Sequence, residues 1–130
     1  MDHRSRRVAE HAVAIAHLMA IPDKRIKEIE IAALLRDIGK ANFPLFMLEK
    51  SPNDYSPEEM AIYKYHPQAC SEILKNVYGY EQIIELVHYH HEKYNGSGFP
   101  SGHKTSKTPM GAYIIGITDY YDHLVENKTR

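Results

Sequence analysis

The chain has 130 residues and is 43% hydrophobic, which suits one compact domain with its own core. Sixteen Lys and Arg against seventeen Asp and Glu give a net charge of -1, so no excess of positive charge attracts nucleic acid or an anionic membrane. The single cysteine, Cys70, excludes an internal disulfide framework and multi-cysteine zinc motifs. No apolar run approaches the ~18 residues of a membrane span. We expect a cytoplasmic protein with no nucleic-acid or membrane partner.

Apolar residues at helical spacing predict two helices in the first third of the chain. The first covers residues 4–20, and Pro22 then breaks the pattern. The second covers 23–40 and is apolar nearly all round in its second half. Two prolines make the following segment, 41–54, a predicted loop with a short apolar contact.

The middle of the chain predicts two short helices separated by a break. Ser56, with Pro57 and Glu59 after it, forms a capping box that predicts a helix over 57–65. Pro67 disfavours helix at His66, which places that histidine at a break before a second helix over 68–77.

The last third of the chain predicts two helices around a long loop. Apolar spacing predicts a helix over 81–92, and the glycines and prolines of 94–108 predict a loop of functional length. A final helix opens at Pro109. Because no alternating strand pattern occurs, the fold class is all-α, a compact bundle of about five to six helices.

Histidines and buried aspartates mark the candidate chemistry. His88, His90 and His91 crowd the end of one predicted helix, and imidazole is the commonest nitrogen ligand of first-row metals. Asp37 and Asp119 each lie in an otherwise apolar stretch. An ionised carboxylate there needs a cation, a metal or several hydrogen-bond donors.

Four motifs in a fixed order carry a resemblance to a known family. They are Arg36-Asp37-Ile38-Gly39-Lys40, then His66-Pro67, then His90-His91-Glu92 running into Asn95-Gly96-Ser97-Gly98-Phe99-Pro100, then Asp119 to Asp122. This series resembles the HD-GYP domain family, a subgroup of the HD superfamily of metal-dependent phosphohydrolases, over nearly the whole chain. The resemblance implies an all-α domain of bacterial signalling that hydrolyses cyclic di-GMP with two or three iron or manganese ions.

The resemblance also implies roles for individual residues. Asp37 would bridge two metals, His66, His90 and His91 would bind the second metal, and Asp119 would bind the first. Two metals lower the pKa of a shared water and neutralise charge on the phosphoryl oxygens.

Further residues would face the ligand rather than the metals. Lys40 would be the cation that faces the scissile phosphate. The residues that the resemblance places in the loop near the ligand are Gly96, Ser97, Gly98, Phe99 and Pro100.

The sequence departs from the family pattern at the first metal. Arg36 stands where the family has the histidine of its His-Asp pair, and Arg4 stands at the place of an early histidine, with His3 one residue away. Helical geometry turns Arg4 inward and His3 about 100° away. A guanidinium cannot lose its proton to become a ligand. Asn95 and Phe99 likewise replace an acidic residue and a tyrosine.

Two states of the site are consistent with these replacements. Either one metal, Fe or Mn, binds through Asp37 and the three histidines, or Arg36 replaces a metal's charge and pairs with Asp37 or Asp119. Both lose two-metal activation of water. Arg36 also remains a candidate phosphate ligand through its planar set of donors.

Three functions stay open. The first is a module with little or no turnover that binds cyclic di-GMP or a related cyclic dinucleotide, or docks a diguanylate cyclase (GGDEF) domain. The second is an active metal-dependent phosphodiesterase. In the third, the arginines form a structural ion pair and the site holds no ligand.

The domain organisation follows from the same resemblance. Residues 1–130 would be a single HD-GYP-like domain, a minimal unit without the family's C-terminal helices. Helix stripes left uncovered would favour a homodimer.

Overall fold

The computed structural model describes residues 3–38, 43–91, 98–99 and 108–128. These parts fold into six α-helices and one 3-10 turn with no strand, which confirms the predicted all-α class and helix number. The elements are α1 (His3–Leu18), α2 (Asp23–Leu35), α3 (Leu45–Leu48), η2 (Pro52–Asp54), α4 (Pro57–Leu74), α5 (Glu81–His88) and α6 (Met110–Lys128). The predicted ligand-facing residues Lys40, Gly96, Ser97 and Pro100 lie outside the described residues.

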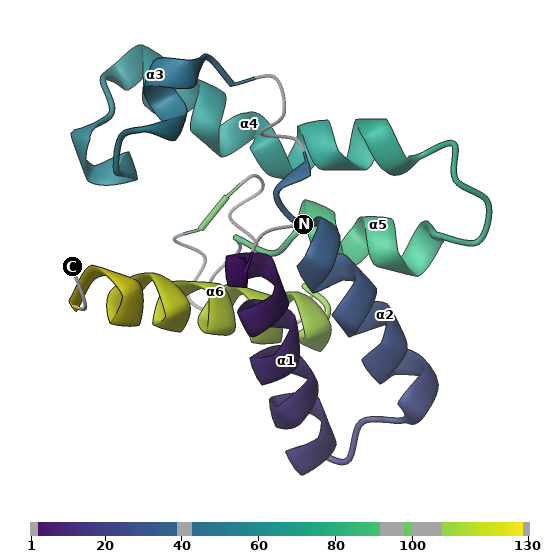
Figure 1. Cartoon of the computed structure of the whole chain (residues 1–130). Coiled ribbons are helices and arrows are strands. Elements are labelled where there is room, and N and C mark those ends of the chain that lie inside the picture. Colours follow the sequence, from purple (N-terminus) through teal and green to yellow (C-terminus); the bar gives the residue numbers. More distant parts are fainter. Residues whose placement is uncertain (1–2, 39–42, 92–97, 100–107, 129–130) are drawn as a thin grey trace.

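The hydrophobic core is built on α1, α2, α5 and α6. Helix α2 packs against α1 on one side and α5 on the other, while α6 crosses α1 (Figure 1). Much of the core consists of alanine, which lets helix axes approach closely. Gly111 also allows close packing of helices, because a Cβ there would lie 2.8 Å from Leu86 and 2.9 Å from Ile29. The buried alanines of this core are Ala9, Ala12, Ala16, Ala32, Ala33 and Ala112.

Helix α4 corrects the predicted break at His66. The capping box is present at its start, with Ser56 Oγ accepting from the Glu59 N–H at 3.2 Å. The helix then continues through Pro67 to Leu74. Proline normally interrupts a helix because it lacks an N–H and crowds the preceding turn. Here both His66 and Pro67 are buried, and that tertiary packing overrides the local preference.

Four helices end earlier than their periodicity predicts, and the two predicted to reach residues 77 and 92 end at Leu74 and His88. Helix α1 stops at Leu18, and Ala20 then takes a left-handed backbone with a φ of 57°. Helix α2 stops at Leu35, so Arg36 and Asp37 lie in the turn that follows it. Asp37 therefore sits at a helix end and not on a helix face, which leaves its carboxylate only partly buried.

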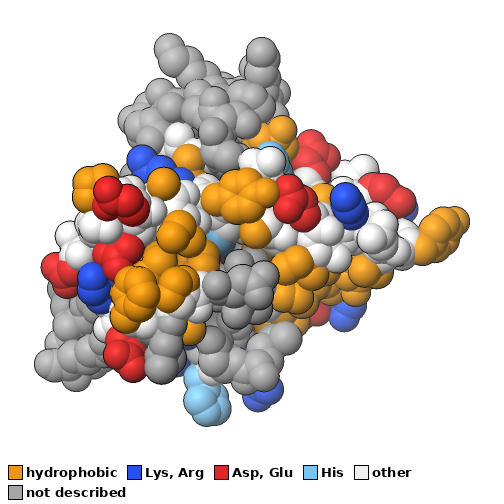
Figure 2. Space-filling view, turned by 90° about the horizontal axis from the view of Figure 1, so that it is seen from above, with side chains coloured by type: hydrophobic (Ala, Val, Ile, Leu, Met, Phe, Trp, Pro, Cys, Tyr) orange, Lys and Arg blue, Asp and Glu red, His pale blue; other side chains and the backbone are white. Residues whose placement is uncertain are grey.

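The first residues of α1, the last residues of α2 and the middle of α6 meet near the centre of the molecule (Figure 1). Hydrophobic side chains also reach the surface, interspersed with acidic and basic ones on the face shown in Figure 2. Along α6 the exposed ones are Met110, Ile117, Tyr120, Tyr121, Leu124 and Val125. The homodimer stays a prediction. Among the described helices, none is long and apolar enough to cross a membrane.

Candidate metal centre

Three imidazole rings converge between α4 and the end of α5. His66 lies in α4, and His90 and His91 follow α5 directly. Nε2 of His66 is 3.4 Å from Nε2 of His90 and 3.1 Å from Nε2 of His91. Around a metal with nitrogen ligands at about 2.1 Å, neighbouring ligand atoms lie roughly 3.0–3.4 Å apart. The spacing of this histidine cluster (His66, His90 and His91) therefore fits one shared ion.

Backbone carbonyls determine the tautomer of two of these rings. Nδ1 of His66 lies 2.6 Å from the Tyr63 carbonyl, and Nδ1 of His90 lies 2.6 Å from the Val87 carbonyl. A carbonyl only accepts, so each Nδ1 carries the proton and donates it. The Nε2 atom of both rings is thus left with a lone pair, the form that binds a metal.

The two carbonyls are available for different reasons. In a regular helix the Tyr63 carbonyl would accept from the N–H of residue 67, but Pro67 has none. The Val87 carbonyl lies in the last turn of α5, where carbonyls have no partner within the helix. Pro67 inside α4 and the end of α5 therefore each leave one backbone carbonyl that can accept from a histidine Nδ1.

The facing lone pairs of His66 and His90 are suited to a shared cation. Neither Nε2 can donate to the other, although the two atoms lie 3.4 Å apart. His90 is fully buried, and this burial lowers its pKa below the ordinary value for histidine. A neutral, buried imidazole is a metal ligand that needs no deprotonation. The histidine cluster therefore fits a metal by spacing, tautomer and charge.

Asp37 connects the histidine cluster to the charged residues on its other side. Its Oδ1 atom is 3.7 Å from Nε2 of His66, and its Oδ2 atom is 3.5 Å from a terminal nitrogen of Arg36. A quarter of its side-chain surface is exposed. The carboxylate thus stands where it can serve a metal on one side and a guanidinium on the other.

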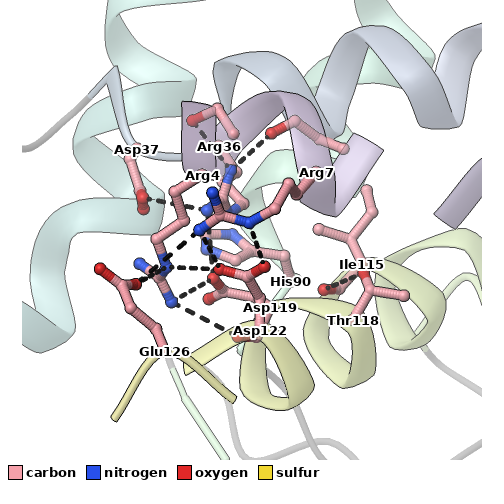
Figure 3. A network of polar contacts seen from close by, with 12 residues as sticks. Arg4, Arg7, Arg36, Asp37, His90, Ile115, Thr118, Asp119, Asp122 and Glu126 are labelled. Atoms are coloured by element: carbon pink, nitrogen blue, oxygen red, sulfur yellow. Dashed lines mark hydrogen bonds and ion pairs between the residues drawn. The ribbon is translucent and has the colours of Figure 1, made fainter. Parts of the chain in front are cut away.

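Arg36 is the central cation of the second group. Its side chain is fully buried, and one terminal nitrogen lies 3.1 Å from Asp119 Oδ1 and 3.5 Å from Asp37 Oδ2 (Figure 3). The other donates to Ser5 Oγ at 3.2 Å and to the Ala33 carbonyl at 2.8 Å. These four contacts hold one positive charge between two carboxylates.

Two more arginines, both from α1, complete the group. Arg4 donates to the same Asp119 Oδ1 atom at 2.9 Å, and Arg7 makes a two-pronged pair with Asp122 at 2.8 and 3.1 Å (Figure 3). Hydrogen bonding from Arg7 lowers the pKa of Asp122 below its ordinary value. Glu126 adds longer contacts to both arginines. We call Arg4, Arg7, Arg36, Asp119, Asp122 and Glu126 the arginine cluster.

The structure divides the predicted metal ligands between the two clusters. It brings His66, His90 and His91 together with Asp37 beside them, whereas it places Asp119 against Arg4 and Arg36. The remaining predicted contact residues within the described chain are Gly98 and Phe99, both half-buried. The Phe99 ring stacks on His91 with 4.7 Å between ring centroids and an angle of 21°.

Two residues of the site were missed by reasoning from the sequence. A Cβ on Gly116 would lie 2.5 Å from the His90 carbonyl oxygen, so only glycine lets α6 pass this close to the histidine cluster. Tyr63 lies one turn before His66, with 5.0 Å between the two ring centroids. Burial raises the pKa of Tyr63, and the charges of Asp119 and Asp37 raise it further. Helical spacing from His66 was the available signal for Tyr63, and the sequence carried none for Gly116.

Comparison with known proteins decides the family. A family model described as HD domain matches residues 1–130. This chain belongs to the HD domain family. Proteins of this family are metal-dependent phosphohydrolases, and this HD domain contains a histidine group able to hold a metal. The resemblance seen in the sequence motifs is thereby confirmed.

Curated relatives of the HD domain include cyclic dinucleotide phosphodiesterases. This chain is 32% identical over 124 residues to the cyclic di-GMP phosphodiesterase response regulator RpfG of Xanthomonas campestris. The match covers 94% of this chain and 32% of the relative. It is 34% identical over 116 residues to a cyclic di-GMP phosphodiesterase of Thermotoga maritima, covering 88% and 31%. A 3'3'-cGAMP-specific phosphodiesterase 2 of Vibrio cholerae is 32% identical over 120 residues, covering 91% and 23%. The chain spans about a third of the length of the first two relatives.

A solved structure supports the fold of the HD domain independently. The structure of Bd1817, a HDG"Y"P protein from Bdellovibrio bacteriovorus, superposes with a TM-score of 0.83 at 26% identity. The match covers 95% of this chain and 40% of the other. The helical arrangement around the two clusters is thus that of an HD-GYP protein.

Proposed function

We propose that this HD domain binds cyclic di-GMP or a related cyclic dinucleotide, holds one metal ion and hydrolyses its ligand slowly or not at all. The observation that carries the proposal is the position of Arg36. Its guanidinium lies between Asp37 and Asp119, the two carboxylates that the family resemblance assigns to the first metal. A second positive ion at that place would be repelled by Arg36 and Arg4.

The metal of this proposal is iron or manganese held by the histidine cluster, with Asp37 as a fourth ligand. When bound, the ion would act as a Lewis acid toward a phosphoryl oxygen. His66 and His90 present their lone pairs through the carbonyls that hold their Nδ1 protons. Arg36 supplies a fixed positive charge beside them, because its partners leave it no freedom to move away.

The first experiment measures metal content, ligand binding and turnover on one sample. The protein is purified without oxygen and loaded with Fe(II) or Mn(II), its bound metal is quantified, and cyclic di-GMP is titrated in a calorimeter before its hydrolysis is followed. We expect at most one metal per chain, measurable binding and slow or absent hydrolysis. Two metals per chain with rapid hydrolysis would overturn the proposal, and absence of any binding would favour a purely structural role for the arginines.

An active phosphodiesterase is the second candidate, and the position of Asp37 favours it. Its Oδ1 atom lies 3.7 Å from His66 Nε2, so one metal with a complete ligand set remains available for catalysis. This alternative predicts hydrolysis that disappears in His90→Ala and in Asp37→Ala. The binding function predicts instead an affinity for the dinucleotide, or for a GGDEF domain, that persists in chelator.

Replacing both arginines tests whether guanidinium groups took the place of a metal. Arg4 and Arg36 both reach the same Oδ1 atom of Asp119, at 2.9 and 3.1 Å. The double variant Arg4→His with Arg36→His would place two imidazoles on that carboxylate, and we expect it to bind one additional metal. The control is Arg7→His, since Arg7 pairs with Asp122 and not with Asp119. Unchanged metal content in the double variant would show that loss of histidines does not explain the altered site.

A further inference from the structure

The peptide unit between Arg36 and Asp37 joins the two clusters. Arg36 is the central cation of the arginine cluster, and the Oδ1 atom of Asp37 lies 3.7 Å from Nε2 of His66 in the histidine cluster. Both residues lie beyond the last residue of α2, so this helix supplies no N–H for the Arg36 carbonyl. The orientation of this one peptide unit therefore affects where the Asp37 carboxylate lies.

Cys70 contacts this peptide unit from α4. Its sulfur is 3.0 Å from the Arg36 carbonyl oxygen. A carbonyl only accepts, so the thiol keeps its proton and donates it. Cys70 and Arg36 are both fully buried, so the bond lies in the interior of the protein. Removing the thiol would leave a buried carbonyl without this partner, a cost that favours movement of the peptide unit.

Helical spacing connects this contact to the candidate metal ligands. Cys70 lies one turn after His66 on α4, so the two side chains share a face of the helix. That face contacts the turn after α2 twice, through the Cys70 thiol on the Arg36 carbonyl and through His66 beside Asp37. Helix α4 thus carries one candidate ligand and, one turn later, a donor that holds the backbone of the next.

Arg36 is held at its two ends by different parts of the protein. Its guanidinium bonds to groups from α1, α2 and α6. Its carbonyl accepts from Cys70 on α4 and leads directly into Asp37. The side-chain contacts therefore belong to the arginine cluster, whereas the backbone contact acts on the residue beside the histidine cluster.

We propose that Cys70 is a positioning residue for the metal centre. Its thiol fixes the peptide unit between Arg36 and Asp37, and so sets the Asp37 carboxylate at the place of the fourth metal ligand. This inference rests on the proposed function, in which Asp37 and the histidine cluster hold one ion. Cys70 does not bind the metal, because its thiol keeps its proton and donates it to the Arg36 carbonyl. Loss of the thiol should lower metal affinity through Asp37 alone.

A double-mutant cycle on Mn(II) affinity tests this dependence. The unmodified protein, Cys70→Ala, Asp37→Ala and the variant with both changes are each titrated with Mn(II) in a calorimeter. We expect Cys70→Ala to weaken Mn(II) binding about tenfold, and Asp37→Ala about a hundredfold because it removes a ligand. Once Asp37 is alanine, adding Cys70→Ala should change Mn(II) affinity by less than about twofold, because the carboxylate that Cys70 positions is gone.

Ile29→Val is the matched control for loss of packing. Ile29→Val and Cys70→Ala each remove a single buried non-hydrogen atom, and Ile29 lies in α2, the helix that leads to Arg36. Urea denaturation of every variant checks that it is folded before titration. Ile29→Val should bind Mn(II) as tightly as the unmodified protein.

Several results would overturn the inference, and they are distinguishable from failure of the proposed function. Unchanged Mn(II) affinity in Cys70→Ala, with a loss in Asp37→Ala, would remove Cys70 from this role and leave the proposed function intact. So would a loss from Cys70→Ala that is the same with and without the Asp37 carboxylate, or the same as in Ile29→Val, since either marks a packing role. If Asp37→Ala itself leaves Mn(II) affinity unchanged, both the inference and the proposed metal site fail.

Discussion

The histidine cluster and the arginine cluster lie side by side, yet they solve the problem of buried polar groups in opposite ways. In the histidine cluster, ring nitrogens converge at 3.1 and 3.4 Å, a spacing that fits a cation bound from outside. In the arginine cluster, carboxylates are already neutralised by permanently charged guanidinium groups. Asp37 touches both. The histidine cluster thus fits a bound metal ion, whereas in the arginine cluster the positive charge comes from side chains of the protein itself.

This difference assigns different consequences to substitutions in the two clusters. Changes in the arginine cluster should act on folding stability, since its charges compensate one another inside the protein. Changes in the histidine cluster should act on metal affinity, and at the half-buried His91 they should alter stability little. Four experiments test this division, from the largest expected effect to the smallest.

Arg36→Met should lower the free energy of unfolding by about 3 kcal/mol, because Asp119 and Asp37 lose a fully buried partner. Urea denaturation measures the change. Adding Asp119→Asn should recover part of the loss, since it removes a buried carboxylate that then keeps only Arg4 of its two arginine partners. The control is Arg25→Met, whose exposed pair with Glu28 is worth only about 0.5 kcal/mol. Equal effects of Arg36→Met and Arg25→Met would contradict a central role for Arg36.

His91→Ala should weaken Mn(II) binding by roughly a hundredfold or more, since loss of even an outer partner of a ligand costs about 10- to 100-fold. Calorimetric titration with Mn(II) measures it. His91 is half-buried, so the fold tolerates the change. His88→Ala is the matched control, because its Nδ1 atom lies 3.1 Å from Ser71 Oγ and outside the cluster. Similar losses in both variants would mean that the metal is held elsewhere.

Pro67→Ala should weaken Mn(II) binding about tenfold, because it disturbs the hydrogen bond between His66 Nδ1 and the Tyr63 carbonyl. The alanine N–H would compete with Nδ1 of His66 for the Tyr63 carbonyl, so the tautomer with a free Nε2 would be less favoured. Nitrogen NMR of the His66 ring reports this tautomer directly. Pro57→Ala, at the first turn of the same helix, should change neither affinity nor tautomer. An unshifted His66 spectrum in Pro67→Ala would remove Pro67 from this role.

Arg7→Gln should lower stability by roughly 1 kcal/mol or less near pH 6, since Arg7 is nearly half exposed. Arg7 holds the pKa of Asp122 below its value in the unfolded chain, which is about 4. The contribution of this pair to folding stability is therefore fully present above about pH 4. It disappears as pH falls through the folded pKa.

Urea denaturation between pH 3 and pH 6 checks this dependence, with the exposed neighbour Arg6→Gln as control. The stability difference between Arg7→Gln and the unmodified protein should shrink as pH falls. A difference that stays constant with pH would show that Asp122 is not the partner through which Arg7 acts.

Much of the fold was predictable from local patterns, and the exceptions have a common cause. Helical phase placed Arg4 inward and His3 outward, and the structure has Arg4 on Asp119 and His3 exposed. The break predicted at His66 was wrong, because burial against the rest of the protein stabilises a helix that Pro67 disfavours locally. Helical periodicity reflects only neighbours along the chain, whereas the burial of Pro67 depends on residues distant in sequence.

The sequence by itself determined the all-α class, the HD family and the residue types of the site, because helical periodicity and motif spacing are local properties. Only the tertiary structure decided which of those residues join the histidine cluster and which join the arginine cluster. Asp119 lies against one arginine from α1 and one from the turn after α2. The lone pairs of His66 and His90 meet only because α4 and α5 pack together. Charge compensation depends on distances of a few ångströms between side chains far apart in sequence, and these distances exist only in the folded protein.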